Sequence, residues 1–112
     1  MKINGKKLVF DFYDSDQKNK QDAYISELNK INEISHIPVP EGVNPVDFEC
    51  DAIKNMFDQV FGEGTGNAVC GYGHNHLVCL ESFNALIENV NEQHKRYRAI
   101  KEKLSMGSRR MK

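Results

Sequence analysis

Residues 76–104 carry the apolar pattern that most restricts how this chain can fold. Apolar side chains recur there at alternating steps of four and three, the heptad spacing of a long helix, with Asn75 as its N-cap. The predicted seam consists of Phe83, Ile87, Val90, His94, Tyr97, Lys101 and Leu104, in which His94 and Lys101 are polar interruptions. At 1.5 Å per residue such a helix is about 44 Å long. A compact domain of this size has a radius of gyration of only about 13 Å, so the far end must project or be covered by another chain.

The net charge of −1 at pH 7 hides an asymmetry between the two parts of the chain. Residues 95–112 contain eight Lys and Arg residues against the single acid Glu102, so residues 1–94 carry a net charge of −8. An acidic body with a basic tail predicts an interaction tail or head-to-tail contact between copies. The alternative is a solvated helix end, whose cations favour the negative end of the helix dipole.

Length and cysteine content narrow the class of protein. A chain of 112 residues predicts a single domain, and no run approaches eighteen apolar residues, so we expect no membrane-spanning helix. The first ten residues include lysines but too short an apolar run for a signal peptide. Three cysteines without a secretory signal favour a reducing compartment over a disulfide framework. We therefore expect a soluble intracellular protein.

The N-terminal residues 1–13 have the pattern of a β-hairpin. Asn4-Gly5 suits a tight two-residue turn, and Leu8, Phe10 and Phe12 alternate with polar or smaller residues to give the second strand one apolar face. A lone hairpin is marginal in water. It must therefore pack on the helices or pair with a strand of another subunit.

Two further helices are predicted before the long one. Asp14 or Ser15 can cap a helix over residues 15–35, and Asn44 followed by Pro45 begins a helix over residues 45–61. Cys50 falls on the apolar face of the second helix and is expected in the core. The predicted fold is mainly α (α+β): one domain over residues 1–112, with an N-terminal hairpin, three helices of which the last projects, and a flexible basic tail at residues 105–112.

The segment from Phe61 to Cys79 combines five glycines with two cysteines and two histidines, and it permits two interpretations. The candidate zinc ligands are Cys70, His74, His76 and Cys79, but all lie within ten residues and their spacing matches no common zinc signature. The other interpretation is a glycine-hinged connector in which Gly62 ends the preceding helix. We expect the connector, and therefore no metal and no cofactor; a small zinc-binding module with a regulatory or nucleic-acid role is the alternative.

The glycines from Gly62 to Gly66 do not form a nucleotide-binding motif. A helix and not a strand precedes them, the Lys-Ser/Thr ending of a phosphate-binding loop is missing, and Glu63 would repel phosphate. No spacing places a base beside a nucleophile, so we expect no enzymatic activity. The basic tail lacks interleaved aromatic residues apart from Tyr97, so specific nucleic-acid binding is not expected either.

The segment from Phe57 to Thr65, FDQVFGEGT, resembles a motif of small proteins encoded in the tail-gene region of siphophages and prophages of Gram-positive bacteria. The opening MKINGKKLVFDF, the long final helix and the terminal Arg-Arg are also similar to that family. The size and basic tail resemble those of phage tail assembly chaperones. This resemblance implies a non-enzymatic protein of the bacterial host cytoplasm that contacts the tape measure protein or the major tail protein. A structural tail or head–tail component is a further alternative, and the Cys/His segment is not part of the family pattern.

If the chain works in assembly, three surfaces are predicted to bind partners or further copies in a homo-oligomer. They are the strand with Leu8, Phe10 and Phe12, the helix face near Tyr97 and Leu104, and the tail with Arg109 and Arg110. An exposed strand edge is a frequent route to oligomers.

Overall fold

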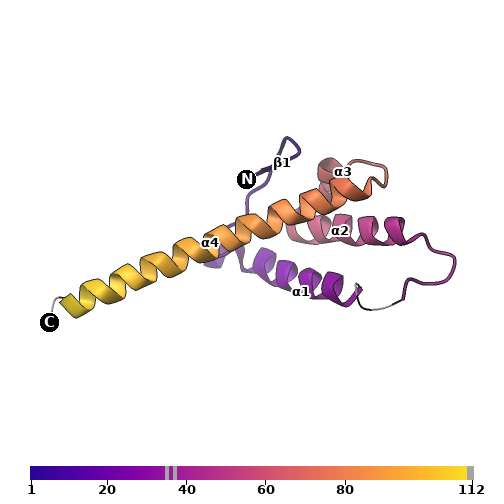
Figure 1. Ribbon diagram of the computed structural model, residues 1–112. Coiled ribbons are helices and arrows are strands. Elements are labelled where there is room, and N and C mark those ends of the chain that lie inside the picture. The colour runs from indigo at the N-terminus through magenta and orange to yellow at the C-terminus, as the bar shows by residue number, and fades with distance from the viewer. Residues whose placement is uncertain (35, 37, 111–112) are drawn as a thin grey trace.

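The computed structural model describes residues 1–34, 36 and 38–110, of which residues 106–110 are described by their backbone only. The elements are, in chain order, β1 (Lys2–Ile3), β2 (Lys6–Lys7), a 3-10 turn η1 (Ser15–Gln17), α1 (Lys18–Ile34), α2 (Pro45–Phe61), α3 (Thr65–Cys70) and α4 (His76–Arg110). Helices α1 and α2 run antiparallel beside the first half of α4, and the second half of α4 projects from them (Figure 1). The predicted mainly helical fold with an N-terminal hairpin and a long last helix is confirmed.

The hairpin has the turn that Asn-Gly predicts but is shorter than expected. Asn4 and Gly5 have φ angles of 50° and 81°, and the register pairs Lys2 with Lys7 and Ile3 with Lys6. Next to these pairs, the backbone groups of Met1 and Leu8 exchange two hydrogen bonds, of 3.0 and 2.8 Å. The prediction of a strand as far as Phe12 was wrong: β2 ends at Lys7, and the backbone of Phe10 and Phe12 is hydrogen-bonded to the Gln93 side chain of α4.

Local capping signals determine the helix ends. The Asn44 side chain accepts a hydrogen bond from the amide of Val46 at 2.8 Å, and Gly62 ends α2 with a φ angle of 115°, so α2 has the predicted bounds. Asp14 caps the 3-10 turn η1, which delays the start of α1 to Lys18. Within the connector, residues 65–70 form the short helix α3.

Helix α4 is longer than predicted. It continues to Arg110, whereas the sequence prediction ended it at residue 104, and residues 111–112 lie outside the described part of the chain. No proline interrupts this stretch. The principal extents are 66 × 30 × 23 Å and the radius of gyration is 17.2 Å, well above the value of about 13 Å for a compact domain. The far end of α4 projects, as its length predicts.

The face of α4 that enters the core differs from the predicted seam. Phe83 and Ile87 are only half-buried, whereas Leu86 is fully buried. The buried positions are Cys79, Ser82, Leu86, Val90 and Gln93. Two of them are polar, so an apolar pattern does not reveal them; their hydrogen bonds to backbone groups satisfy them in the core. None of the helices described in the structure is long and apolar enough to cross a membrane.

Candidate protein-interaction surfaces

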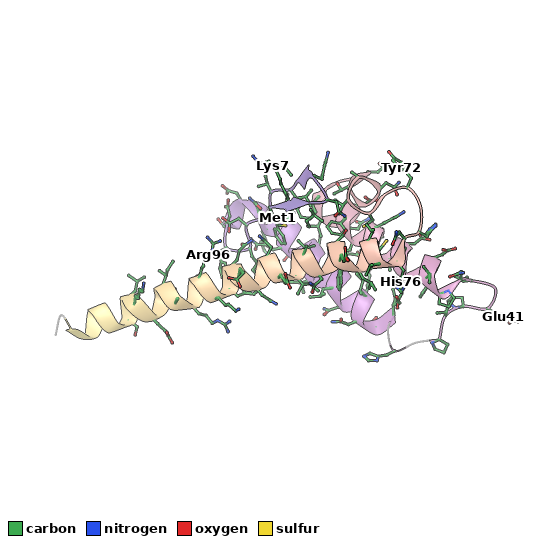
Figure 2. The ribbon with its side chains drawn as sticks, turned by 45° about the horizontal axis from the view of Figure 1, so that its top comes forward. Met1, Lys7, Glu41, Tyr72, His76 and Arg96 are labelled. Carbon is green, nitrogen blue, oxygen red and sulfur yellow. The ribbon has the colours of Figure 1, made fainter. Side chains whose placement is uncertain are left out.

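The buried face of α4 continues past the body of the molecule as an exposed apolar stripe. Tyr97, Ile100 and Leu104 lie on the same side of the helix as Leu86 and Val90, because successive residues are about 100° apart around the axis. Their exposed fractions are 41%, 58% and 62%. We call these three residues the apolar stripe. Arg96 lies near the point where α4 leaves the body (Figure 2), and the three residues of the stripe follow Arg96 in the sequence.

Basic side chains border the apolar stripe on both sides. The same helical geometry places Arg96 and Lys103 along one edge and Arg98 and Lys101 along the other. The Lys101 ammonium lies 5.7 Å from the centroid of the Tyr97 ring, a distance at which a cation interacts with an aromatic face. An apolar ridge with cationic edges fits an apolar groove in an acidic surface.

Aromatic contacts hold the base of the stripe in place. The rings of Tyr13 and Tyr97 are stacked, with centroids 4.1 Å apart and an interplanar angle of 7°. The Tyr13 hydroxyl is hydrogen-bonded to His94, whose ring also meets that of Phe12 edge to face at 4.8 Å. The extended N-terminal segment thus positions the point where α4 leaves the body. Because these contacts are long-range in sequence, the heptad pattern could not indicate them.

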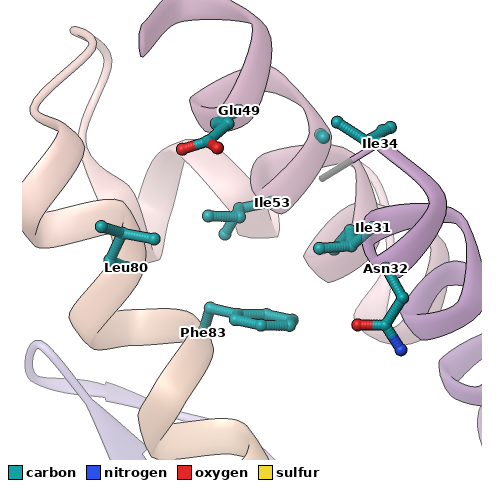
Figure 3. A pocket seen from close by; sticks show the side chains of 8 residues that line it. Ile31, Asn32, Ile34, Glu49, Ile53, Leu80 and Phe83 are labelled. Carbon is teal, nitrogen blue, oxygen red and sulfur yellow. The ribbon is translucent and has the colours of Figure 1, made fainter. Parts of the chain in front are cut away.

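A second surface is an open apolar groove where α1, α2 and α4 meet. Its volume is about 230 Å³ (Figure 3). The lining residues are Ile31, Asn32, Ile34, Glu49, Ala52, Ile53, Leu80 and Phe83. We call this the α1–α2–α4 groove. Among the lining residues, all of them in the described part of the chain, Glu49 is the one with a charged side chain, and Leu80 is 42% exposed. The sequence does not indicate the groove because its residues come from three separate helices.

The predicted partner-binding residues differ in how far the fold exposes them. Leu8 and Phe10 are 5% and 6% exposed, and their side chains pack in the core of the protein. Phe12 is half-buried and packs against Phe10 and Tyr24. The reason is the short hairpin: residues 8–12 pack on the helices instead of forming a free edge strand.

Tyr97 and Leu104 are exposed, as a contact surface requires. The sequence prediction missed Ile100, although its position three residues after Tyr97 and four before Leu104 is typical of one helix face. Arg109 and Arg110 lie in the last turn of α4, and their side chains are outside the described part of the chain.

The four candidate zinc ligands are separated by the fold. Cys70 and Cys79 are buried in the core, whereas His74 and His76 lie on the surface against the beginning of α2. The described residues contain no group of three or more His, Cys, Asp or Glu side chains that could hold a metal ion. In this segment, therefore, the two thiols lie in the core and the two imidazoles lie at the surface.

The two histidines tie the loop before α4 to acidic residues of α2. His74 Nε2 lies 2.9 Å from an oxygen of Asp51, and its Nδ1 lies 3.7 Å from an oxygen of Asp47. His76 is hydrogen-bonded to Glu49. Because Asp47 and Asp51 face opposite nitrogens of one ring, they orient the imidazole and do not converge on a shared ion. This arrangement supports a connector that is held to α2 by side-chain pairs.

The three cysteines form a buried thiol cluster where α2, α3 and α4 meet. Burial, followed by the hydrogen bond with Cys79, raises the pKa of Cys50 to about 12. Burial also raises the pKa values of Cys70 and Cys79. The thiolate is the nucleophilic and metal-binding form of cysteine, so these thiols are unreactive in the folded chain. The predicted core position of Cys50 agrees with this.

The raised thiol pKa values predict alkaline destabilisation. A group that stays protonated in the folded state above its ordinary pKa of 9.0 contributes stability that is complete below about pH 9. That contribution falls as the pH rises toward the folded value, because the unfolded chain then releases the proton. We expect the free energy of unfolding in urea to be level between about pH 7 and 8 and to fall between about pH 9 and 10.5, by up to about 1.4 kcal/mol per pH unit for each thiol.

Cys50→Ala is the control for this pH dependence. It removes one of the titrating thiols, so the slope above about pH 9 should become shallower, whatever the variant's stability at neutral pH. An unchanged slope would show that Cys50 does not contribute.

Comparison with known proteins places the chain in a family. Residues 4–112 match a family model described as "Family of unknown function (DUF6673)". No curated protein and no solved structure matches the chain. Because the family match begins at Asn4 and continues to the last residue, this chain belongs to the family of unknown function DUF6673.

Proposed function

We propose that this protein is a non-enzymatic assembly factor that acts through protein–protein contacts, in the manner of the phage tail assembly chaperones that its layout resembles. The observation that carries the proposal is the apolar stripe, which continues the buried face of α4 into solvent on a projecting helix. On this proposal the chain works in the cytoplasm of a bacterial host, and its partners are the tape measure protein or the major tail protein.

The stripe is suited energetically to reversible binding. Full burial of a large apolar side chain contributes about 1.5–3 kcal/mol of favourable free energy. Covering the exposed parts of the three stripe residues would therefore contribute about 1 kcal/mol each to the binding free energy. The helix is already formed, so little backbone entropy is lost on binding. The basic edges increase the rate of encounter with an acidic partner and make it sensitive to salt.

The thiols and three of the four histidines are engaged in structural contacts, which supports a non-enzymatic role. The thiols are buried with raised pKa values. His74 and His76 pair with carboxylates of α2, and His94 packs between Phe12 and Tyr13. The structure therefore favours contact surfaces over a reaction centre.

Coexpression with the tail proteins of the same phage or prophage tests the proposal. The tagged chain is expressed with the tape measure protein and, separately, with the major tail protein, and the amount that copurifies is measured. The stripe variant replaces Tyr97, Ile100 and Leu104 by Ser. The control replaces Val9, Ile25 and Tyr72 by Ser, which are exposed to 58%, 47% and 88% and lie outside the stripe. We expect the wild type and the control to retain the partner and the stripe variant to lose it.

Two outcomes would count against the proposal. One is that neither tail protein copurifies with the wild type; the other is that the stripe variant and the control bind equally. Mass spectrometry of purified virions then separates the two assembly roles. A chaperone should be missing from the particles, whereas a structural tail or head–tail component should be present in every one.

A further inference from the structure

We propose that the apolar stripe of one copy docks in the α1–α2–α4 groove of a second copy, so that the chains associate head to tail. This inference rests on the proposed function in one respect, since both assign the stripe to protein contacts. Beyond the proposed function, it states what fills the groove, namely the stripe of another copy, and in which direction the copies assemble.

The two surfaces match in shape and chemistry. The groove is open and largely apolar, and Ile31, Ile53 and Phe83 approach it from three different helices (Figure 3). The stripe presents three apolar side chains at positions i, i+3 and i+7 of a straight helix. That spacing is the one by which an amphipathic helix binds in an apolar groove.

Charge selects the groove of a second copy over its stripe. Helix α2 and residues 76–94 of α4, which form two of the groove's three walls, carry seven carboxylates and one ammonium group. That ammonium belongs to Lys54, which is 8% exposed and donates a hydrogen bond to the Gly73 carbonyl at 2.6 Å. Residues 95–110 carry seven basic side chains and one acidic one. Pairing two stripes would bring like charges together, whereas docking in the groove brings opposite charges together.

The shape of the molecule makes the contact intermolecular. The groove lies at the end of the body where α4 begins and α1 ends, and the stripe lies on the far half of α4 (Figure 1). Because α4 is one continuous helix, a copy cannot place its own stripe in its own groove. The described part of each copy therefore has one exposed stripe and one open groove. Such a heterologous contact produces an open chain of subunits, or a ring if the rotation between them closes.

Complementation between two variants tests the direction of this contact. The stripe variant here is Ile100→Ser with Leu104→Ser, which leaves the groove intact; the groove variant is Leu80→Arg, which places a cation against the incoming basic edges. Both changes are at exposed positions, and unchanged circular dichroism and urea midpoints would confirm that the variants fold. Each is expected to be monomeric in sedimentation at tens of micromolar and low salt. Their mixture should form a heterodimer with twice the monomer mass, because one intact stripe and one intact groove remain.

The wild type should form larger species that dissociate as the salt concentration rises, since screening weakens the charge attraction. Ile25→Arg, at an exposed position of α1 outside the groove lining, is the matched control and should associate like the wild type. A wild type that stays monomeric at low salt would overturn the proposal. So would a mixture that remains monomeric, or an association that Leu80→Arg leaves unchanged, which would indicate stripe-to-stripe pairing.

Failure of this inference is distinguishable from failure of the proposed function. Sedimentation uses the purified chain without any other protein, whereas the tail proteins enter the coexpression experiment. A heterodimer of the two variants, with no capture of tail proteins, would support self-docking and reject the assembly partners. Capture of a tail protein by a strictly monomeric chain would support the assembly function and reject self-docking.

Discussion

Gly66→Ala is expected to lower the free energy of unfolding by about 3 kcal/mol, because it forces two helices apart. A β-carbon at Gly66 would lie 2.4 Å from the carbonyl oxygen of Lys54 and 2.7 Å from its α-carbon. These are backbone atoms of α2 and cannot rotate away. The Gly66 amide also donates to Asp58 at 2.7 Å, so α3 cannot shift without weakening that bond. Helix α3 therefore packs at a distance that only glycine allows.

Gly73→Ala is the matched control for this prediction. No atom lies within 4 Å of a β-carbon built at Gly73, and its φ angle is not in the left-handed region. Its effect should be within about 0.5 kcal/mol, with a small gain from the reduced entropy of the unfolded chain. Urea unfolding followed by circular dichroism measures both variants. Equal stability of the two would show that α3 tolerates a larger separation from α2.

Gln93→Leu is expected to cost about 3 kcal/mol and to detach the N-terminal segment from α4. The Gln93 side chain accepts from the amide of Phe12 at 2.7 Å and donates to the carbonyl of Phe10 at 2.9 Å. Leucine has a similar size but neither group, so two backbone groups would remain unpaired at a position where the side chain is 8% exposed. Each unpaired buried group costs about 1–3 kcal/mol.

The loss of unfolding free energy should depend on which hydrogen bond of Gln93 is removed, and it should not occur at an exposed position of the same helix. Gln93→Glu keeps an acceptor for the Phe12 amide but loses the donor to Phe10, so its stability should fall between those of the wild type and the leucine variant. Asn91→Leu, at an exposed position of the same helix, should change stability by less than about 0.5 kcal/mol. Urea unfolding gives the free energies, and hydrogen exchange at the Phe12 amide should accelerate in Gln93→Leu. Equal stability of Gln93→Leu and Asn91→Leu would contradict the assigned role of Gln93.

The features that the sequence predicted well depend on a few neighbouring residues. Asn4-Gly5 adopts its expected turn, and Asn44, Pro45 and Gly62 begin and end α2 where local rules place them. The projection of α4 also follows from the sequence, since a continuous helix longer than the body must extend beyond it. Predictions of this kind require no knowledge of what packs against the segment.

The predictions that failed depend on contacts between distant segments. A strand to Phe12 requires an opposing strand, but the Phe12 amide and the Phe10 carbonyl are hydrogen-bonded to the Gln93 side chain of α4. The buried face of α4 includes Ser82 and Gln93, whose polar atoms are satisfied by Val78, Asn4 and the segment 10–12. A search for apolar periodicity does not register buried polar residues. It therefore predicted a seam on a face of α4 that is rotated about the helix axis relative to the face that is buried in the structure.

For the candidate site, the sequence alone was enough to predict the basic, projecting helix end with Tyr97 and Leu104 on it, because charge and helical spacing are properties of consecutive residues. The other features of the site became visible only in the folded chain. It showed that the stripe is the exposed continuation of a core face, assembled the groove from three helices, and separated the thiols from the imidazoles of one short segment. These outcomes depend on which surfaces exclude water together, and that is a property of the packed chain, not of any single segment.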